Sequence, residues 1–370
     1  IIIIGVFMYI KYLQLINFRN YNKLSIELDK NVNVFIGDNA QGKTNILESI
    51  YYSSVGKSHR TNKDKEMINW NAESAYIKLY VVKNRLDKKI EIKIFKEGKK
   101  GINVNSIKIN KISELLGILN VVMFSPEDLK IVKESPSFRR KFLDIELCKL
   151  SNKYYYNLVQ YNKVLNERNA LLRKGGKEFL SIIEIYDKQL SKFGAFIIKE
   201  REKYIEKMNE KGVIIHNDIT AGAENISFGY LSSIKGENDI ESELFNALYK
   251  NRKSDFEKKN TSVGPHRDDL SIKINHVDVR NFGSQGQQRT ATLTIKFSSL
   301  EIIKDITGEY PVLLLDDVLS ELDSKRQKYI LNSIKNIQTV ITCTGLENIK
   351  NHIEGNYKIF NVVKGKCINN

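Results

Sequence analysis

The sequence predicts an α/β fold in which a domain built on mixed β-sheets is interrupted by an inserted α-helical domain. Three observations support this prediction. An apolar strand at 32–36 leads through a glycine-rich turn into a helix, and a second apolar strand at 312–315 ends in two acids. Between them, residues 126–259 place apolar side chains at the three- and four-residue steps of helices.

The helical segment lies between two stretches with strand patterns. Strands are predicted at 269–275 and 277–279, after the helices, as well as in the N-terminal third of the chain. We therefore assign residues 8–125 and 260–370 to one sheet domain and residues 126–259 to the inserted helical domain. A chain of 370 residues is long enough for about two domains.

The individual helices and strands are predicted from the spacing of apolar residues and from the Gly and Pro residues between them. Alternating or continuous apolar residues predict strands at 9–15, 24–28, 32–36, 75–83, 89–96, 101–109 and 339–342. In the insertion, Ser135 followed by Pro136 is typical of the start of a helix. Two further helices, separated by Gly175-Gly176, are expected to form a helical hairpin whose apolar faces belong to the core.

The glycine-rich turn at the end of the 32–36 strand matches the phosphate-binding pattern G-x-x-x-x-G-K-[ST]. Its residues are Gly37, Asp38, Asn39, Ala40, Gln41, Gly42, Lys43 and Thr44. Glycines allow the backbone to wrap closely around phosphates, and the N–H groups of a helix N-terminus bind their charge. Lys43 can reach the β- and γ-phosphates of a nucleotide and Thr44 can hold Mg²⁺. A nucleoside triphosphate, ATP, is the expected ligand.

A second motif is the buried strand that ends in Asp316 and Asp317. Acids at the carboxyl end of such a strand lie at the ligand-binding edge of the sheet. Asp316 is the candidate second ligand of Mg²⁺, and Asp317 is placed to orient or deprotonate an attacking water. Lys43 and Asp317 are therefore the candidate catalytic residues.

A third motif contains small residues just before a helix that we expect to begin near Thr290. It consists of Ser284, Gln285, Gly286 and Gln287. This is a second potential anion site, and because one phosphate loop already serves the β- and γ-phosphates, it indicates a second nucleotide on another subunit. The alternative for residues 283–289 is an ordinary glycine-rich helix entry. Ser320, Glu321, Leu322 and Asp323 follow the two acids.

The charge of the chain favours a polyanionic partner. It has 59 Lys and Arg against 44 Asp and Glu, a formal net charge of +15, which points first to nucleic acid and second to an anionic membrane. The alternative is a lineage that uses lysine and asparagine heavily. The candidate phosphate contacts are Lys57, His59, Arg60, Lys63, Lys65, Arg139, Arg140 and Lys141. For each lysine the alternative is a solvated charge, and for Arg139 and Arg140 it is a bracing role on an amphipathic helix.

Cysteine usage and the N-terminus suggest a cytoplasmic location without membrane attachment. The three cysteines lie far apart and form no C-x-x-C pair, so neither a zinc site nor a disulfide framework is indicated. The apolar N-terminus is too short for a membrane helix. Met8 is a candidate natural start, with residues 1–7 as an upstream extension.

Together these motifs resemble the ATP-binding-cassette heads of the SMC class. Ser284–Gln287 stands where the signature motif of that class belongs, and Ser320–Asp323 where its D-loop belongs. The resemblance narrows to the RecF family over almost the whole chain. The residues that carry it are Phe18-Arg19-Asn20-Tyr21, the Gly37–Thr44 loop, Phe124–Leu129, Ser137–Asp144, Gly264–Asp269, Ser284–Thr290 and Leu315–Asp323.

The resemblance implies a P-loop ABC-type ATPase head that dimerises with ATP. The signature motif of one subunit would close on the phosphate loop of the other, and Arg19 and Asn20 would belong to the ATP site. It also implies binding to duplex DNA, single strands and gap junctions, and action with RecO and RecR in RecA loading and SOS induction. Slow, DNA-stimulated ATP hydrolysis would reset the dimer, whose main role is that of a DNA-binding switch.

The sequence departs from the wider cassette pattern, and two other functions stay open. No glutamine occurs in Phe124–Leu129, Cys343 follows the 339–342 strand where a switch histidine is usual, and Asp317 replaces the usual glutamate. The shorter Asp317 side chain predicts slow turnover. One alternative is a small-molecule P-loop kinase or transferase, which leaves Ser284–Gln287 without a role. The other is an SMC-like scaffold that uses ATP structurally.

Overall fold

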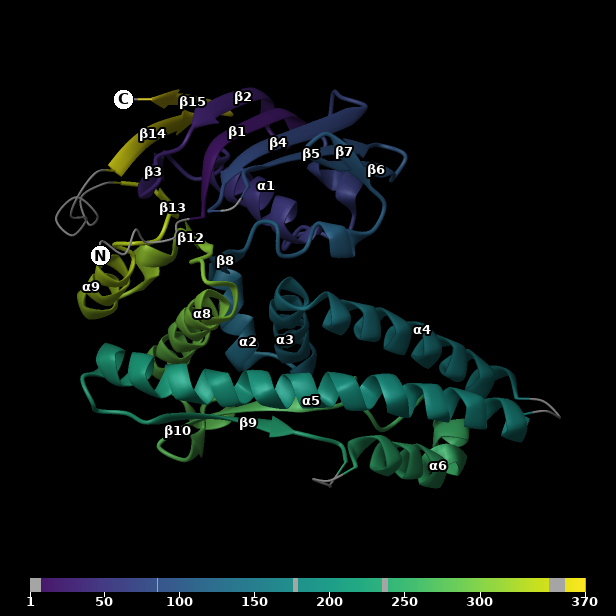
Figure 1. The fold of residues 1–370 in the computed structure, drawn as a ribbon. Helices are drawn as coiled ribbons and strands as arrows, with labels where there is room; N and C mark the ends of the chain where they lie inside the picture. The colour runs from purple at the N-terminus through teal and green to yellow at the C-terminus, as the bar shows by residue number, and fades with distance from the viewer. Residues whose placement is uncertain (1–7, 85, 176–178, 235–238, 346–356, 370) are drawn as a thin grey trace. The chain divides into compact units, whose positions relative to one another are not determined.

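The computed structural model describes residues 8–369, apart from 85, 176–178, 235–238 and 346–356. The expected upstream extension at residues 1–7 lies outside this range. The chain divides into two compact units (Figure 1). Unit 1 comprises Ile1–Asp128, Asp218–Gly222 and Leu293–Asn370, and unit 2 comprises Leu129–Asn217 and Ala223–Thr292. The segment 260–292, which the sequence-based division gives to the sheet domain, thus belongs to unit 2.

Unit 1 contains an antiparallel sheet with the strand order β2-β1-β4-β5-β6-β7. Its strands are β1 (Tyr9–Phe18), β2 (Tyr21–Glu27), β4 (Ser74–Val82), β5 (Lys88–Phe95), β6 (Lys100–Val104) and β7 (Ile107–Ile109). The single strand expected at 101–109 is two strands, because the chain turns at Asn105 and Ser106, whose φ angles are 50° and 67°. These positive φ values are typical of a hairpin turn.

The second sheet of unit 1 has the order β15-β14-β3-β13-β12-β8. Its strands are β3 (Val32–Ile36), β8 (Val121–Phe124), β12 (Val312–Asp316), β13 (Thr339–Cys343), β14 (Tyr357–Val363) and β15 (Lys366–Asn369). All neighbours are parallel except β14 and β15. The apolar strands expected before the phosphate loop and before the two acids are confirmed as β3 and β12, with β13 between them.

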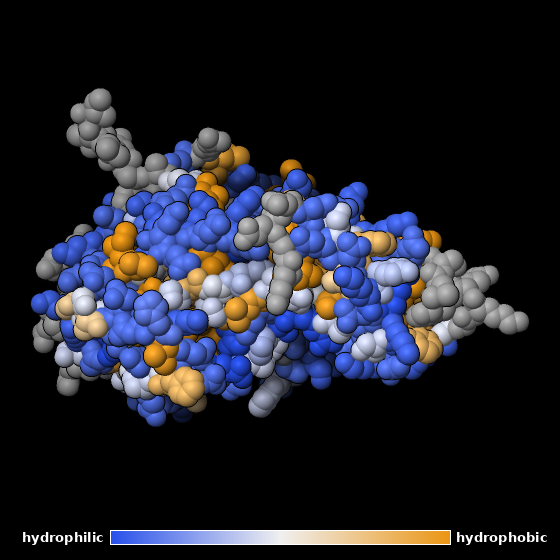
Figure 2. Space-filling view, turned by 90° about the horizontal axis from the view of Figure 1, so that it is seen from below, coloured by the Kyte–Doolittle hydropathy of each residue, from blue (hydrophilic) through white to orange (hydrophobic). Residues whose placement is uncertain are grey.

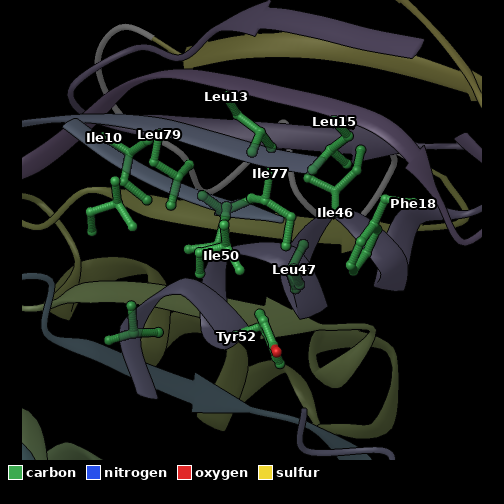
Figure 3. Close-up of a cluster of buried hydrophobic side chains, with 14 of the residues drawn as sticks. Ile10, Leu13, Leu15, Phe18, Ile46, Leu47, Ile50, Tyr52, Ile77 and Leu79 are labelled. Carbon is green, nitrogen blue, oxygen red and sulfur yellow. The ribbon is translucent and has the colours of Figure 1, made fainter. Parts of the chain in front are cut away.

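Helix α1 (Lys43–Val55) forms the core of unit 1 with the antiparallel sheet. Figure 3 shows Ile46, Leu47 and Ile50 of α1 among Leu13, Leu15, Ile77 and Leu79 of β1 and β4, and all of these side chains are fully buried. Burying each one contributes about 1.5–3 kcal/mol. The remaining elements of this unit are the short helices η1 (Asp64–Met67), η2 (Ile112–Glu114), η3 (Pro126–Asp128) and η4 (Val318–Glu321), helix α9 (Ser324–Ser333) and the part of α8 (Gln285–Thr307) from Leu293.

Unit 2 is built on helices with a small antiparallel sheet, ordered β11-β10-β9. Its elements are α2 (Leu129–Lys133), α3 (Pro136–Leu150), α4 (Asn152–Lys174), α5 (Phe179–Thr220, up to Asn217), β9 (Ile226–Leu231), α6 (Ile240–Lys258), β10 (Asp269–Ile274), β11 (Val277–Asp278), α7 (Val279–Phe282) and the start of α8. The expected helical hairpin is confirmed as α4 and α5. Strand β9 was not expected in the helical segment, although the buried alternate residues Ile226 and Phe228 carry a strand pattern.

A buried ionic cluster joins three helices of unit 2. Arg168 on α4 is fully buried and contacts Asp187 on α5 at 2.7 Å and Asp255 on α6 at 2.8 Å. Asp187 also pairs with Arg252 at 2.7 Å. Buried charges are tolerated only when they are paired and hydrogen-bonded, so this cluster fixes the alignment of the three helices.

The surface is largely polar. Figure 2 shows one face on which hydrophilic residues predominate and hydrophobic residues gather in small separate groups, consistent with the 28% of charged residues in the chain. Among the helices of the described residues, none combines the length and the apolar character needed to cross a membrane.

Candidate functional site

The phosphate loop is held between β3 and α1 with its lysine turned inward. Lys43 is buried, and its Nζ donates to the carbonyl oxygens of Gly37 at 2.7 Å and Asp38 at 3.1 Å. No carboxylate pairs with this ammonium among the residues that the structure describes. A buried cation with only carbonyl partners is ready to bind an anion, which is the environment that the β- and γ-phosphates of a nucleotide require.

The two fixed glycines of the loop are required for different reasons. A Cβ at Gly37 would lie 2.3 Å from the carbonyl oxygen of Val362 in β14, so a neighbouring strand excludes any side chain there. Gly42 has φ +113°, and a Cβ on it would lie 2.5 Å from Nδ2 of Asn20. Only glycine fits both this backbone conformation and this contact.

The side chain of Asn20 holds the backbone of the phosphate loop in place. Its Nδ2 donates to the carbonyl oxygen of Gln41 at 2.8 Å, and its Oδ1 accepts from Nδ2 of Asn45 at 2.9 Å. Gln41 is held from the other side, because its Oε1 accepts from the backbone N–H of Lys364 at 2.6 Å and its carbonyl oxygen accepts from that of Gly365 at 3.1 Å. The structure therefore gives Asn20 a framing role, and its contact with ATP stays a prediction.

Glu48, which we did not single out from the sequence, organises a network behind the loop. It is fully buried and accepts hydrogen bonds from Nε and Nη2 of Arg19 at 2.9 and 2.6 Å and from Oγ of Ser58 at 2.5 Å. Burial raises the pKa of Glu48, but the hydrogen bonds from Arg19 and Ser58 outweigh it, and the pKa is lowered. Arg60 reaches the same carboxylate at 3.6 Å.

Arg19 is thereby committed to protein partners. Besides Glu48, its Nη1 donates to the carbonyl oxygen of Glu66 at 2.8 Å. Its expected contact with ATP stays a prediction. The network matters because it connects α1, which begins in the phosphate loop, with the basic segment 57–63.

The two acids lie at the carboxyl end of β12, and the first of them contacts the phosphate-loop helix. Asp316 is buried, and its Oδ1 accepts from Oγ1 of Thr44 at 3.0 Å and from Oγ1 of Thr342 at 2.9 Å. Burial, partly offset by these hydrogen bonds, raises its pKa. Thr342 was missed in the sequence, although the parallel register of β12 and β13 pairs it with Asp316. The hydroxyl of Thr44 and the carboxylate are hard oxygen ligands that fit Mg²⁺.

Asp317 follows in the left-handed conformation, with φ 52°. Its backbone N–H donates to Oγ1 of Thr342 at 2.9 Å, and its carbonyl oxygen accepts from Oγ of Ser320 at 2.7 Å. Burial, with the nearby charge of Asp317, raises the pKa of the Cys343 thiol to about 11. The thiol that stands in the place of a switch histidine is therefore protonated at neutral pH and unsuited to act as a base.

The third motif forms the start of α8, which begins at Gln285 rather than near Thr290 as expected. Ser284 and Gln287 make a reciprocal capping box: the N–H of Gln287 donates to Oγ of Ser284 at 3.2 Å, and that of Ser284 donates to Oε1 of Gln287 at 2.9 Å. Nε2 of Gln287 donates in turn to Oε1 of Glu224 at 3.0 Å. Glu224 is a support that sequence analysis did not detect.

The segment after the two acids is an ordered turn. Ser320 and Glu321 belong to η4, Leu322 is buried, and Oδ1 of Asp323 caps α9 by accepting from the N–H of Arg326 at 2.9 Å. An aspartate is a favoured residue at this position. The expected D-loop is thus an ordered turn between β12 and α9.

The basic candidates separate into exposed and buried side chains. Lys57, Lys63 and Lys65 are exposed, as is the side chain of Arg60 at 44%. Burial lowers the pKa of His59 to about 4. This lowered pKa disfavours the charged form of His59, and its contact with phosphate stays a prediction.

Arg139 and Arg140 on α3 were candidate DNA contacts, but both side chains bind other parts of the protein. Arg139 is 3% exposed, and its Nε and Nη2 hold Asp269 at 2.6 and 2.9 Å. It braces α3 against β10 and cannot face DNA, so that assignment is wrong. Arg140 is half-buried and donates to the carbonyl oxygen of Asp268 at 2.9 Å, whereas Lys141 is exposed.

A phosphate loop, a strand of the same sheet whose terminal acid contacts that loop, and a capped glycine-containing helix start define an ATP-binding-cassette type of ATPase head, of the kind found in SMC proteins. The family described as RecF/RecN/SMC N terminal domain matches residues 9–367. The chain belongs to the RecF family of this class.

Two relatives and two solved structures illustrate this. The DNA replication and repair protein RecF of Clostridium tetani (strain Massachusetts / E88) is 69% identical, covering 98% of this chain and 100% of the relative. That of Clostridium kluyveri is 66% identical, covering 97% and 99%. A structure of the recombination mediator protein RecF with ATP, in the RecFOR pathway, has a TM-score of 0.90 at 40% identity and covers 98% of both chains. An Smc head from Pyrococcus furiosus shares the fold, with a TM-score of 0.57 at 18% identity, covering 98% of this chain and 96% of the other.

Proposed function

We propose that this protein is an ATP-gated DNA-binding switch of replication and recombinational repair, in which two subunits close around ATP on DNA. The observation that carries the proposal is the Thr44–Asp316 contact at 3.0 Å, which assembles a metal-binding edge beside the inward-turned Lys43. Its close relatives are DNA replication and repair proteins, and a similar RecF structure contains ATP. The net charge of +15 suits DNA as the polyanion.

The residues divide the chemistry as follows. Lys43 exchanges its carbonyl partners for the β- and γ-phosphates, and the loop N–H groups bind the remaining oxygens. Thr44 and Asp316 would hold Mg²⁺, which neutralises charge on the phosphates. Asp317 orients the attacking water or accepts its proton. Because an aspartate is shorter than the glutamate usual in cassettes, turnover is slow, and hydrolysis serves to release the dimer.

The signature motif is proposed to act on a second subunit. A capped helix start with a serine hydroxyl is an anion site, and Ser284 would complete the γ-phosphate site of a partner's phosphate loop. This arrangement makes ATP the bridge of a homodimer. Action at single-strand gaps with RecO and RecR, leading to RecA loading and SOS induction in the cytoplasm, belongs to the same proposal by family membership.

Complementation between two inactive variants tests the composite site. Lys43→Arg disables the phosphate loop and Ser284→Arg disables the signature motif, so each alone should hydrolyse no ATP. Mixing them forms heterodimers that retain one intact site, and DNA-stimulated hydrolysis should return to about a quarter of the wild-type rate. Absence of recovery, together with a monomer in sedimentation under ATP and DNA, would contradict the proposal.

The same measurements separate the alternatives. A small-molecule kinase or transferase would turn over ATP as a monomer and leave Ser284→Arg fully active. A structural ATP scaffold would dimerise with ATP, yet Lys43→Arg would dissociate from DNA as fast as the wild type, because hydrolysis would not control release.

A further inference from the structure

The one tryptophan of the chain lies almost entirely in solvent. Trp70 is 95% exposed, between η1 and β4 of unit 1. Tryptophan is a large apolar side chain that is strongly buried on average, and aromatic rings exposed to this degree are typical of surfaces that bind something. The exposed ring is therefore available to bind a ligand.

The turn that presents Trp70 is firmly anchored. The N–H of Ala72 donates to the carbonyl oxygen of Asn69 at 2.9 Å, closing a β-turn with Trp70 and Asn71 at its tip. Asn69 fixes this turn to the end of β1 and to the β1–β2 connection. Its N–H donates to the carbonyl oxygen of Asn17 in β1 at 2.8 Å, and its Nδ2 donates to that of Arg19 in the connection at 2.9 Å. A ring on such a support loses little conformational entropy on binding.

The segment that carries the ring is polar and holds two exposed lysines. Lys63 and Lys65 are exposed on the segment that leads to Trp70, and Asn71 is exposed beside it. Of the acids in this segment, Asp64 and Glu73 pair with lysines at 2.8 and 2.9 Å, and the exposed Glu66 accepts from the hydroxyl of Thr61. A protein interface would offer a contiguous apolar core. An exposed flat ring on a segment with exposed lysines is instead the combination that binds single-stranded nucleic acid.

We propose that Trp70 stacks on an unpaired base of single-stranded DNA, while Lys63 and Lys65 contact the flanking phosphates. This deepens the proposed function and rests on it. The turn is hydrogen-bonded to the β1–β2 connection through Asn69 and Arg19. The same connection contains Asn20, whose side chain is hydrogen-bonded to the phosphate loop. Trp70 would thus mark where the single-stranded part of a gap lies on unit 1.

Tryptophan fluorescence of the wild type provides a direct test, since the signal comes from Trp70 alone. Oligothymidylate should quench it in a saturable manner, and a blunt duplex should quench it little. Quenching by ATP without DNA would assign the ring to the nucleotide site, and quenching that rises with protein concentration alone would assign it to a second copy of the chain. Either result overturns the inference.

Variants separate stacking from charge. Trp70→Ala and Trp70→Leu should each weaken oligothymidylate binding about tenfold, while Trp70→Phe should retain most of the affinity. The salt dependence should be unchanged in Trp70→Ala. In Lys63→Ala or Lys65→Ala its slope should fall by about 0.7, because each variant neutralises one phosphate fewer. The exposed Tyr156→Ala on α4 is the matched control and should bind normally.

The outcomes also separate this inference from the proposed function. If the wild type binds gapped DNA and Trp70→Ala binds equally well, only the stacking site is refuted. If the wild type binds no DNA with or without ATP, the proposed function fails and this inference with it. The thermal midpoint of Trp70→Ala should equal that of the wild type, because the removed ring buries almost no surface.

Discussion

Replacing Glu48 by glutamine should destabilise unit 1 and loosen its basic loop. The carboxylate accepts from two nitrogens of Arg19 at 2.9 and 2.6 Å and from Ser58 at 2.5 Å. A glutamine amide has one acceptor oxygen and must turn its NH₂ group toward one of these donors. Glu48→Gln therefore leaves the guanidinium of Arg19 without its charge partner.

The size of the effect follows from burial. Removing one partner of a fully buried ion pair costs about 3–5 kcal/mol. Glu48 is fully buried, but the side chain of Arg19 is 20% exposed, so water can compensate part of its charge. We expect a loss of about 2–3 kcal/mol in the free energy of unfolding at pH 7. Because Ser58 and Arg60 lose their anchor, DNA affinity should fall as well.

The pH dependence of the free energy of unfolding provides an independent test of the role of Glu48. The folded-state pKa of Glu48 is lowered, so its stabilisation is present above the unfolded value near 4.3 and is lost as the pH falls through the folded value. The difference between wild type and Glu48→Gln should be constant from pH 6 to 8 and should shrink below about pH 4.5.

Urea unfolding monitored by circular dichroism measures both quantities. The control is Glu73→Gln, which removes an ion pair with Lys96 whose carboxylate is 84% exposed and should change stability little. The reasoning is refuted if Glu48→Gln matches this control at pH 7, or if its deficit grows on acidification.

Three further perturbations follow from the structure. Gly42→Ala should cost about 2 kcal/mol or more and abolish ATP binding, since φ is +113° and the space is filled, whereas Gly101→Ala in open space should leave ATP binding intact; calorimetric titration with ATP checks both. Arg168→Met should cost about 3–5 kcal/mol in urea unfolding, while the exposed Arg173→Met should cost less than about 0.5. His59, whose pKa is lowered to about 4, should stabilise the fold above pH 6.5 and lose that contribution as the pH falls to 4; His59→Gln should flatten the stability profile between pH 5 and 7 by about 1–2 kcal/mol.

The parts of the site that sequence analysis predicted are those encoded by neighbours along the chain. Residues 37–42 form the expected turn between β3 and α1, and Lys43 and Thr44 begin the helix. The glycines and the apolar residues on both sides determine this structure within a few residues. The strand ending at Asp316 is recognisable for the same reason, since four apolar residues precede the acid. Such short-range patterns are sufficient to predict the class of site.

The parts that were missed depend on partners far away in the chain. Arg139 carries the spacing of a basic helix face, and nothing local indicates that Asp269 neutralises and buries it. Thr342 meets Asp316 only because β12 and β13 are parallel neighbours. Glu48 lies on α1 among buried residues, where a charged side chain is explained only by Arg19 and Ser58. Pairing of this kind is a property of the tertiary fold and produces no periodic pattern in the sequence.

Strand β3 has a consequence for how the protein is made. Both of its neighbours in the sheet, β13 and β14, come from the last part of the chain, and the turn at Lys364 and Gly365 then fastens Gln41 of the phosphate loop. A ribosome has synthesised β3 long before either neighbour exists, so both edges of this apolar strand wait unpaired in the nascent chain. The phosphate loop therefore gains its full set of contacts only after β13, β14 and the turn at Lys364 and Gly365 have been synthesised.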